Sequence, residues 1–89
     1  MGIYSNMLLH IYSLRHPVLR KDATSVNLKT AMGELTILEN HRALMTLVQQ
    51  GPIRITDAAG TEETVDAQSG FLEVRPSPET RGEVNILLD

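Results

Sequence analysis

Apolar residues alternate with more polar ones along most of this chain, and a period of two is the pattern of half-buried β-strands. Val26 and Leu28 flank Asn27, for example, so one face of that strand would be apolar and the other polar. The same spacing recurs at Leu9 and Ile11, Leu35 and Ile37, Ile53 and Ile55, Val65 and Ala67, Leu72 and Val74, and Val84, Ile86 and Leu88. Short alternating strands at regular intervals predict an all-β sandwich or barrel.

Turn-forming residues lie between these strands. Residues 30–33 separate two strands, and residues 51–52, Gly-Pro, open another. Residues 57–60, Asp-Ala-Ala-Gly, are typical of a hairpin turn because glycine accepts a positive φ. Residues 76–78, Pro-Ser-Pro, end a strand because proline cannot donate to a ladder. His16 precedes a proline, which predicts an extended or turn conformation there.

Residues 42–50 are compatible with two structures. Their apolar positions follow the spacing of a helical turn, at Ala43, Leu44, Leu47 and Val48. The segment is short, however, and Thr46 and Val48 are residue types that favour a strand. We therefore expect a strand.

Composition excludes several classes of protein. The chain has 89 residues, so one domain is expected, and its net charge of -3 argues against a nucleic-acid binder, which needs clustered Lys and Arg. The aromatic residues Tyr4, Tyr12 and Phe71 are too few for a base-stacking platform. The absence of cysteine favours the cytosol, and no apolar run approaches the ~20 residues of a membrane-spanning helix.

No pattern of a catalytic, metal or cofactor site stands out. His10, His16 and His41 are far apart and lack the spacing of zinc ligands. The serines lack a Gly-x-Ser-x-Gly setting, and the glycines form no phosphate-binding loop. Glu62 and Glu63 lie at the expected hairpin tip, where exposure makes carboxylates poor acid–base catalysts. A small hydrolase or metal enzyme is therefore disfavoured, and we expect no cofactor.

Two segments carry a family signature. Between residues 33 and 55 the shared positions are Gly33, Glu34, Leu35, Ile37, Leu38, His41, Leu44, Thr46, Leu47, Gly51, Ile53, Arg54 and Ile55. Residues 69–74, Ser-Gly-Phe-Leu-Glu-Val, match a second stretch closely. From about Leu8 to Asp89 the chain thereby resembles the N-terminal β-sandwich domain of the epsilon subunit of F-type ATP synthase. It departs from the usual family pattern at Thr36, Glu39, Arg42 and Ala43.

The resemblance implies a flattened antiparallel β-sandwich of roughly ten short strands. It implies a single domain over residues 1–89, and we expect residues 1–6, which precede the resemblance, to be a disordered extension. Family members usually continue into a helical hairpin that in many of them restrains ATP hydrolysis. This chain stops at Asp89, so we expect it to lack that hairpin.

The resemblance also implies a function without chemistry. The chain would be a non-catalytic central-stalk (rotor) subunit of a proton-translocating ATP synthase, linking the gamma subunit to the c-ring and coupling rotation to ATP synthesis. It would lie at the cytoplasmic face of the bacterial plasma membrane, as a peripheral part of the complex. The residues implied for the c-ring contact are Ala31, Met32 and Glu34. The residues implied for the gamma contact are Ser13, His41, Arg42 and Thr46.

The residues themselves leave plainer alternatives open. Glu34 can be a solvated turn residue, and His41 can bond backbone carbonyls of its own loop. Met32 and Met45 are expected to pack rather than to recognise a partner, although Met32 is the better candidate for exposure. Gly70 predicts a bend where the backbone approaches a neighbour. The alternative to the ATP synthase subunit is an independent β-sandwich module that binds another protein.

Overall fold

The computed structural model describes residues 6–15 and 17–89. Most of the expected extension, residues 1–5, and the turn residue His16 lie outside the described residues. The described chain contains no helix, and its nine strands are β1 (Met7–Ser13), β2 (Leu19–Ala23), β3 (Ser25–Thr30), β4 (Gly33–Leu38), β5 (Leu44–Val48), β6 (Gly51–Thr56), β7 (Glu62–Ala67), β8 (Gly70–Arg75) and β9 (Glu83–Leu88). The all-β prediction is confirmed, and the helical alternative for residues 42–50 is wrong because β5 lies there.

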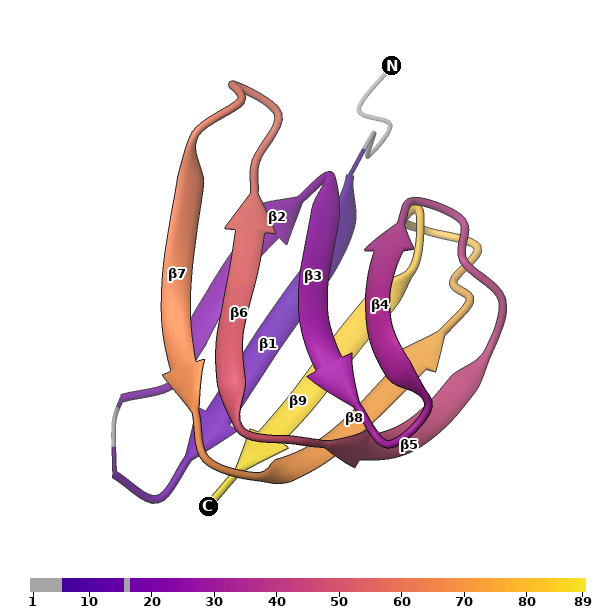
Figure 1. Cartoon of the computed structure of the whole chain (residues 1–89). Helices are drawn as coiled ribbons and strands as arrows, with labels where there is room; N and C mark the ends of the chain where they lie inside the picture. The colour runs from indigo at the N-terminus through magenta and orange to yellow at the C-terminus, as the bar shows by residue number, and fades with distance from the viewer. Residues whose placement is uncertain (1–5, 16) are drawn as a thin grey trace.

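The strands form one curled sheet in the order β2-β1-β9-β8-β5-β3-β6-β7, with β4 on the other side of β3. Figure 1 shows that the sheet folds into two layers, β2-β1-β9-β8-β5 behind and β7-β6-β3-β4 in front. Every pairing is antiparallel except the parallel pairing of β1 with β9. The expected sandwich is therefore present, and its back layer contains the first and last strands, β1 and β9, paired side by side.

The chain crosses between the two layers at the end of β5. There the Ala31 N–H donates to the Leu47 carbonyl at 3.0 Å, and the Gln49 N–H donates to the Lys29 carbonyl at 2.9 Å. These bonds tie the end of β5 to β3, whose remaining length pairs with β6. The turn between β3 and β4 is thereby anchored to both layers.

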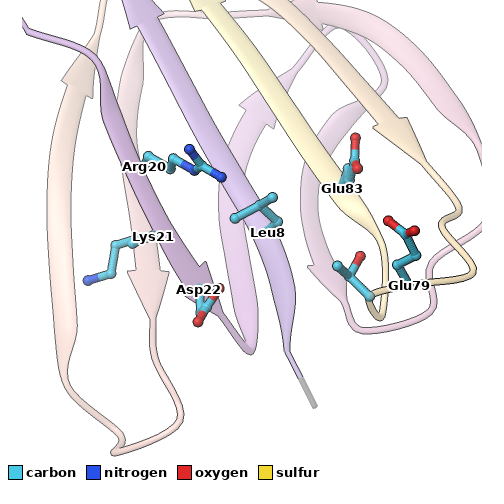
Figure 2. Close-up of a pocket in the computed structure, with 7 residues that line it drawn as sticks. Leu8, Arg20, Lys21, Asp22, Glu79 and Glu83 are labelled. Carbon is cyan, nitrogen blue, oxygen red and sulfur yellow. The ribbon is translucent and has the colours of Figure 1, made fainter. Parts of the chain in front are cut away.

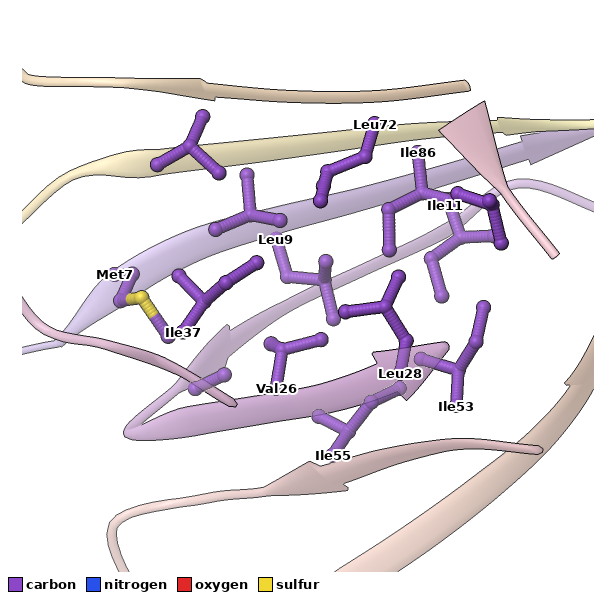
Figure 3. Packing of buried hydrophobic residues seen from close by; sticks show 14 of the residues in the cluster. Met7, Leu9, Ile11, Val26, Leu28, Ile37, Ile53, Ile55, Leu72 and Ile86 are labelled. Carbon is purple, nitrogen blue, oxygen red and sulfur yellow. The ribbon is translucent and has the colours of Figure 1, made fainter. Parts of the chain in front are cut away.

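The core lies between the layers and consists of the alternating apolar residues of the sequence. Figure 3 shows these side chains meeting from both sides, with Leu9, Ile11, Leu72 and Ile86 from one layer and Val26, Leu28, Ile53 and Ile55 from the other. Most of them have no exposed surface at all. Burial of one such side chain is worth about 1.5–3 kcal/mol, so their sum holds the layers together.

The outer surface of the β4-β3-β6-β7 layer is polar. Thr36, Asn27, Arg54 and Thr64 are successive neighbours in register across its four strands. The Asn27 side-chain amide donates to the Thr36 hydroxyl at 2.8 Å. This layer therefore follows the usual rule of an antiparallel sheet, with one face in the core and one in water.

Gly70 begins β8 at a point where two strands approach closely, as the sequence predicts. A Cβ atom at this position would lie 2.1 Å from the Leu87 carbonyl oxygen, which is backbone and cannot turn aside. Any larger residue must push β8 away from β9.

We predict that Gly70→Ala lowers the free energy of unfolding by about 1–3 kcal/mol, because the added methyl group overpacks this contact. The measurement is urea denaturation followed by circular dichroism. The control is Ala58→Ser, which also adds one atom but does so at an exposed position of the β6–β7 turn. Equal stability of Gly70→Ala and the wild type would contradict the close approach.

Candidate functional site

The turn between β3 and β4 is built around a buried threonine. Thr30 is only 2% exposed, and its hydroxyl donates to the Gly33 carbonyl at 2.8 Å while accepting from the Met32 N–H at 3.1 Å. Gly33 has a φ of 105°, a conformation that favours glycine. The turn is therefore held in one shape from inside.

This turn brings together all three residues implied for the c-ring contact. Ala31 and Glu34 are exposed, and Met32 is 63% exposed at the tip. Lys29 lies opposite Glu34 in register. Its aliphatic chain packs over Gly51, where an added Cβ atom would lie 3.0 Å from the Lys29 Cδ. Within residues 6–15 and 17–89 the Glu34 carboxylate forms no ion pair, so it can meet a partner.

The residues implied for gamma do not form one cluster. His41 and Arg42 lie in the loop before β5, at the upper end of the molecule in Figure 1. Ser13 lies at the opposite end, because Ser13, Leu88, Gly70, Val48 and Thr30 are successive neighbours in register across five strands. Ser13 thus shares its end of the sandwich with the β3–β4 turn.

His41 has a structural role in its own loop. Its Nδ1 lies 2.7 Å from the Arg42 carbonyl oxygen, and because a carbonyl only accepts, Nδ1 carries the proton. The preceding residue, Asn40, has a φ of 64° and donates its N–H to the Arg81 carbonyl at 2.7 Å. The loop is thereby fastened to the segment between β8 and β9, and the exposed Arg42 projects from it.

Thr46, the fourth residue implied for gamma, faces the interior and is only 9% exposed. Its strand neighbours Met45 and Leu47 point outward and are 63% and 58% exposed. The prediction that Met45 packs is therefore wrong, because the register of β5 turns the side chain away from the core. A partner that contacts this part of β5 would therefore touch the exposed Met45 and Leu47 side chains rather than the buried Thr46.

The most extensive candidate surface was not predicted from the sequence. Tyr12, Leu87, Phe71 and Leu47 are successive cross-strand neighbours on the outside of β1, β9, β8 and β5. All are exposed, by 41%, 49%, 36% and 58% respectively. Together with the exposed Met45 of β5, they form the outer apolar face: Tyr12, Met45, Leu47, Phe71 and Leu87.

Among the described residues, the other exposed large apolar side chains are Leu14 and Val18 in the loop between β1 and β2, and Met32 and Leu38 in the β3–β4 hairpin. Contiguous apolar surface of this kind marks a protein interface more often than chance exposure. A signal was present in the sequence, since residues 44–45, 47–48 and 86–88 are apolar at successive positions, the pattern of strands covered on both faces.

Charged residues border this face where β1 and β9 begin. Figure 2 shows a groove there, in which Leu8 lies between β2 and the start of β9. The other residues that line this groove are Arg20, Lys21, Asp22, Glu79, Thr80 and Glu83. Asp22, Leu8 and Glu83 are neighbours in register. Lys21 turns away and pairs with Glu63 at 3.0 Å, joining β2 to β7. An apolar centre with a polar rim is the usual anatomy of an interface.

The described residues contain no group of three or more His, Cys, Asp or Glu side chains that could hold a metal ion. Nor do they contain a helix long and apolar enough to cross a membrane.

The family model for the β-sandwich domain of the ATP synthase delta/epsilon chain matches residues 6–89. The chain belongs to this family. Its similarity to the ATP synthase epsilon chain of Acinetobacter baylyi is 40% identity over 72 residues, which is 81% of this chain and 52% of that protein. The epsilon chain of Acinetobacter baumannii strain AYE matches with the same identity and coverage. This chain thus spans about half the length of these relatives.

Solved structures show the same fold at low identity. A chain in the cryo-EM structure of the Euglena gracilis mitochondrial ATP synthase, OSCP/F1/c-ring, superposes with a TM-score of 0.82 at 17% identity, covering 99% of this chain and 53% of that chain. A chain in the central stalk/c-ring structure from Tetrahymena thermophila gives 0.66 at 16% identity, covering 97% and 66%.

Thr30→Val is expected to lower the free energy of unfolding by about 1–2 kcal/mol, because valine keeps the shape but loses both hydrogen bonds of the turn. Thermal unfolding measures the change. Thr64→Val is the matched control, since Thr64 is exposed on the outer surface of β7. A Thr30 variant as stable as this control would show that the hydroxyl does not hold the turn.

Proposed function

We propose that this chain is the β-sandwich of a non-catalytic central-stalk subunit of a proton-translocating ATP synthase, where it joins the gamma subunit to the c-ring. Its place would be the cytoplasmic face of a bacterial plasma membrane, as a peripheral part of the complex. Family membership supports the assignment, and so do two separate surfaces suited to protein contacts. The relatives that match most of this chain are epsilon chains of bacterial ATP synthases.

The observation that carries the proposal is the outer apolar face. A face this apolar on one layer, opposite a polar outer surface on the other, suits a partner that stays bound. We assign it to gamma because three of the four residues implied for gamma border it. Ser13 follows Tyr12 on β1, Thr46 lies between Met45 and Leu47 on β5, and Arg42 stands in the loop that leads into β5.

The β3–β4 turn suits a smaller and more polar contact, which we assign to the c-ring. Met32 supplies an exposed apolar tip, and Glu34 supplies a carboxylate beside it that forms no ion pair with the residues the structure describes. An exposed ion pair is worth roughly 0–1 kcal/mol, so Glu34 would orient the contact more than strengthen it. Because the turn and the outer apolar face are separate surfaces, one chain can hold both partners at once.

Replacing Leu47 and Phe71 together by Ser is expected to weaken binding to the cognate gamma subunit at least about tenfold, since interface anchors cost more than 1 kcal/mol when truncated. Isothermal titration calorimetry measures the affinity. The control pair is Thr36→Ser with Thr64→Ser on the polar layer, which should leave the affinity unchanged. Circular dichroism checks that both double variants are folded.

Two results would contradict this assignment. If the folded Leu47/Phe71 variant bound gamma like the wild type, gamma would dock elsewhere. If the wild-type chain failed to bind gamma at micromolar concentrations, the alternative of a β-sandwich module with another protein partner would be favoured.

At the turn, Glu34→Gln should weaken binding of the gamma–chain complex to detergent-purified c-ring by no more than about fivefold, the equivalent of an exposed ion pair. Met32→Ser should also weaken it, and neither change should alter the affinity for gamma. Glu62→Gln, at the β6–β7 hairpin, is the control for removal of one charge. A c-ring affinity that depends on Glu62 and not on Glu34 would refute the assignment of the turn.

A further inference from the structure

A row of polar side chains lies beside the apolar row on this side of the sheet, since His10, Asn85 and Glu73 are successive neighbours in register on β1, β9 and β8. His10 is half-buried on the outside of β1, and its ring stacks on Tyr12 with centroids 5.8 Å apart and planes inclined by 10°. In register it lies between Arg20 of β2 and Asn85 of β9. It thus occupies the boundary between the apolar row and the charged rim.

The two ring nitrogens of His10 are not equivalent. Nδ1 is buried and has no hydrogen-bond partner among the described residues. The Arg20 guanidinium only donates, the Asn85 amide nitrogen donates to the Glu73 carboxylate at 3.4 Å, and neither the Asn85 carbonyl oxygen nor any other acceptor of the described residues hydrogen-bonds to Nδ1. A proton on Nδ1 would be a buried donor without an acceptor, which is costly. A bare Nδ1 lone pair is also without a partner, but buried orphaned N–H groups are rarer in proteins than under-satisfied acceptors, so we expect the neutral ring to hold its proton on Nε2.

Arg20 adds a second donor beside this one. Directly opposite residues on paired strands have Cβ atoms about 4.5–5.5 Å apart, so the His10 and Arg20 side chains lie within reach of one common group. Arg20 is exposed and forms no ion pair within residues 6–15 and 17–89. In Figure 2 its guanidinium extends from β2 toward β1. Asp22, Glu79 and Glu83 line the same groove, but none of the carboxylates in the described part of the chain forms an ion pair with Arg20.

We propose that His10 and Arg20 together bind one carboxylate of the protein that covers the outer apolar face. His10 donates from Nε2, Arg20 donates from its guanidinium, and the stack on Tyr12 fixes the direction of the imidazole. This inference rests on the proposed docking of gamma to this face and specifies its chemistry. The partner surface must be apolar opposite Phe71 and Leu87 and must carry an Asp or Glu opposite His10.

The first test uses the free chain and needs no partner. Long-range ¹H–¹⁵N correlation spectra at pH 8 report which nitrogen of each histidine is protonated. His10 is expected to be protonated on Nε2, and His41, whose Nδ1 donates to the Arg42 carbonyl, serves as the internal contrast with the proton on Nδ1. A proton on Nδ1 of His10 would overturn the proposal.

The second test measures affinity for gamma by calorimetry. His10→Phe keeps the stack on Tyr12 but removes the donor, and it is expected to weaken binding at least about tenfold, as is Arg20→Gln. His10→Gln keeps an N–H donor and should retain most of the affinity. Arg54→Gln, on the polar outer surface of the other layer, is the matched control for loss of a guanidinium and should bind as the wild type does.

Acidic residues of gamma give the complementary test. Neutralising one of them, Asp→Asn or Glu→Gln, should remove the difference between wild-type chain and His10→Phe. Equal binding of wild type and His10→Phe to unmodified gamma would overturn the carboxylate contact alone. Failure of the wild-type chain to bind gamma would overturn the proposed function together with it.

Discussion

The packing of two layers of alternating aliphatic side chains is the interaction on which the rest of this structure depends. Leu9 and Ile86 from one layer and Leu28 and Ile55 from the other are fully buried, and each loses the favourable free energy of burial if its strand shifts by one residue. Because side chains in a strand alternate strictly, fixing the inward set fixes the outward set as well. The functional surfaces are thus a consequence of how the core is filled.

The outward sets of the two layers differ in chemistry. Asn27 and Arg54 represent a polar surface that water covers well, whereas Phe71 and Leu87 represent a surface that gains from being covered. Because of this asymmetry, the small sandwich has one outer surface that favours association while its core stays buried. The β3–β4 turn, anchored through Thr30, then projects from the end of the sandwich as a separate contact.

The two proposed contacts differ in the way they would work. The outer apolar face offers area and can hold a partner through many side chains, among which His10 and Arg20 would select its charge and register. The turn offers few atoms on a rigid support. A rotor subunit needs stable binding to one neighbour and a defined orientation toward another. Neither property requires a catalytic group.

Much of the fold could be predicted from local chemistry. The period of two gave the strands and their inward residues, glycine and proline marked the turns, and Gly70 marked a close approach. The candidate site was predicted less well. Residues at 31, 32 and 34 come together because they share one hairpin, whereas Ser13 and His41 belong to opposite ends of the molecule. Their positions depend on the order and direction of distant strands, which spacing along the chain does not report.

The sequence by itself determined which residues form strands and which faces of those strands enter the core, because both follow from alternation and local backbone preference. It also determined the family, through short runs around the β3–β4 turn and Gly70. Only the tertiary structure decided that Tyr12, Leu47, Phe71 and Leu87 lie in one row, because they come from four strands that are brought into register by pairing. Surfaces assembled across strands belong to the fold, and no local segment of this chain contains one.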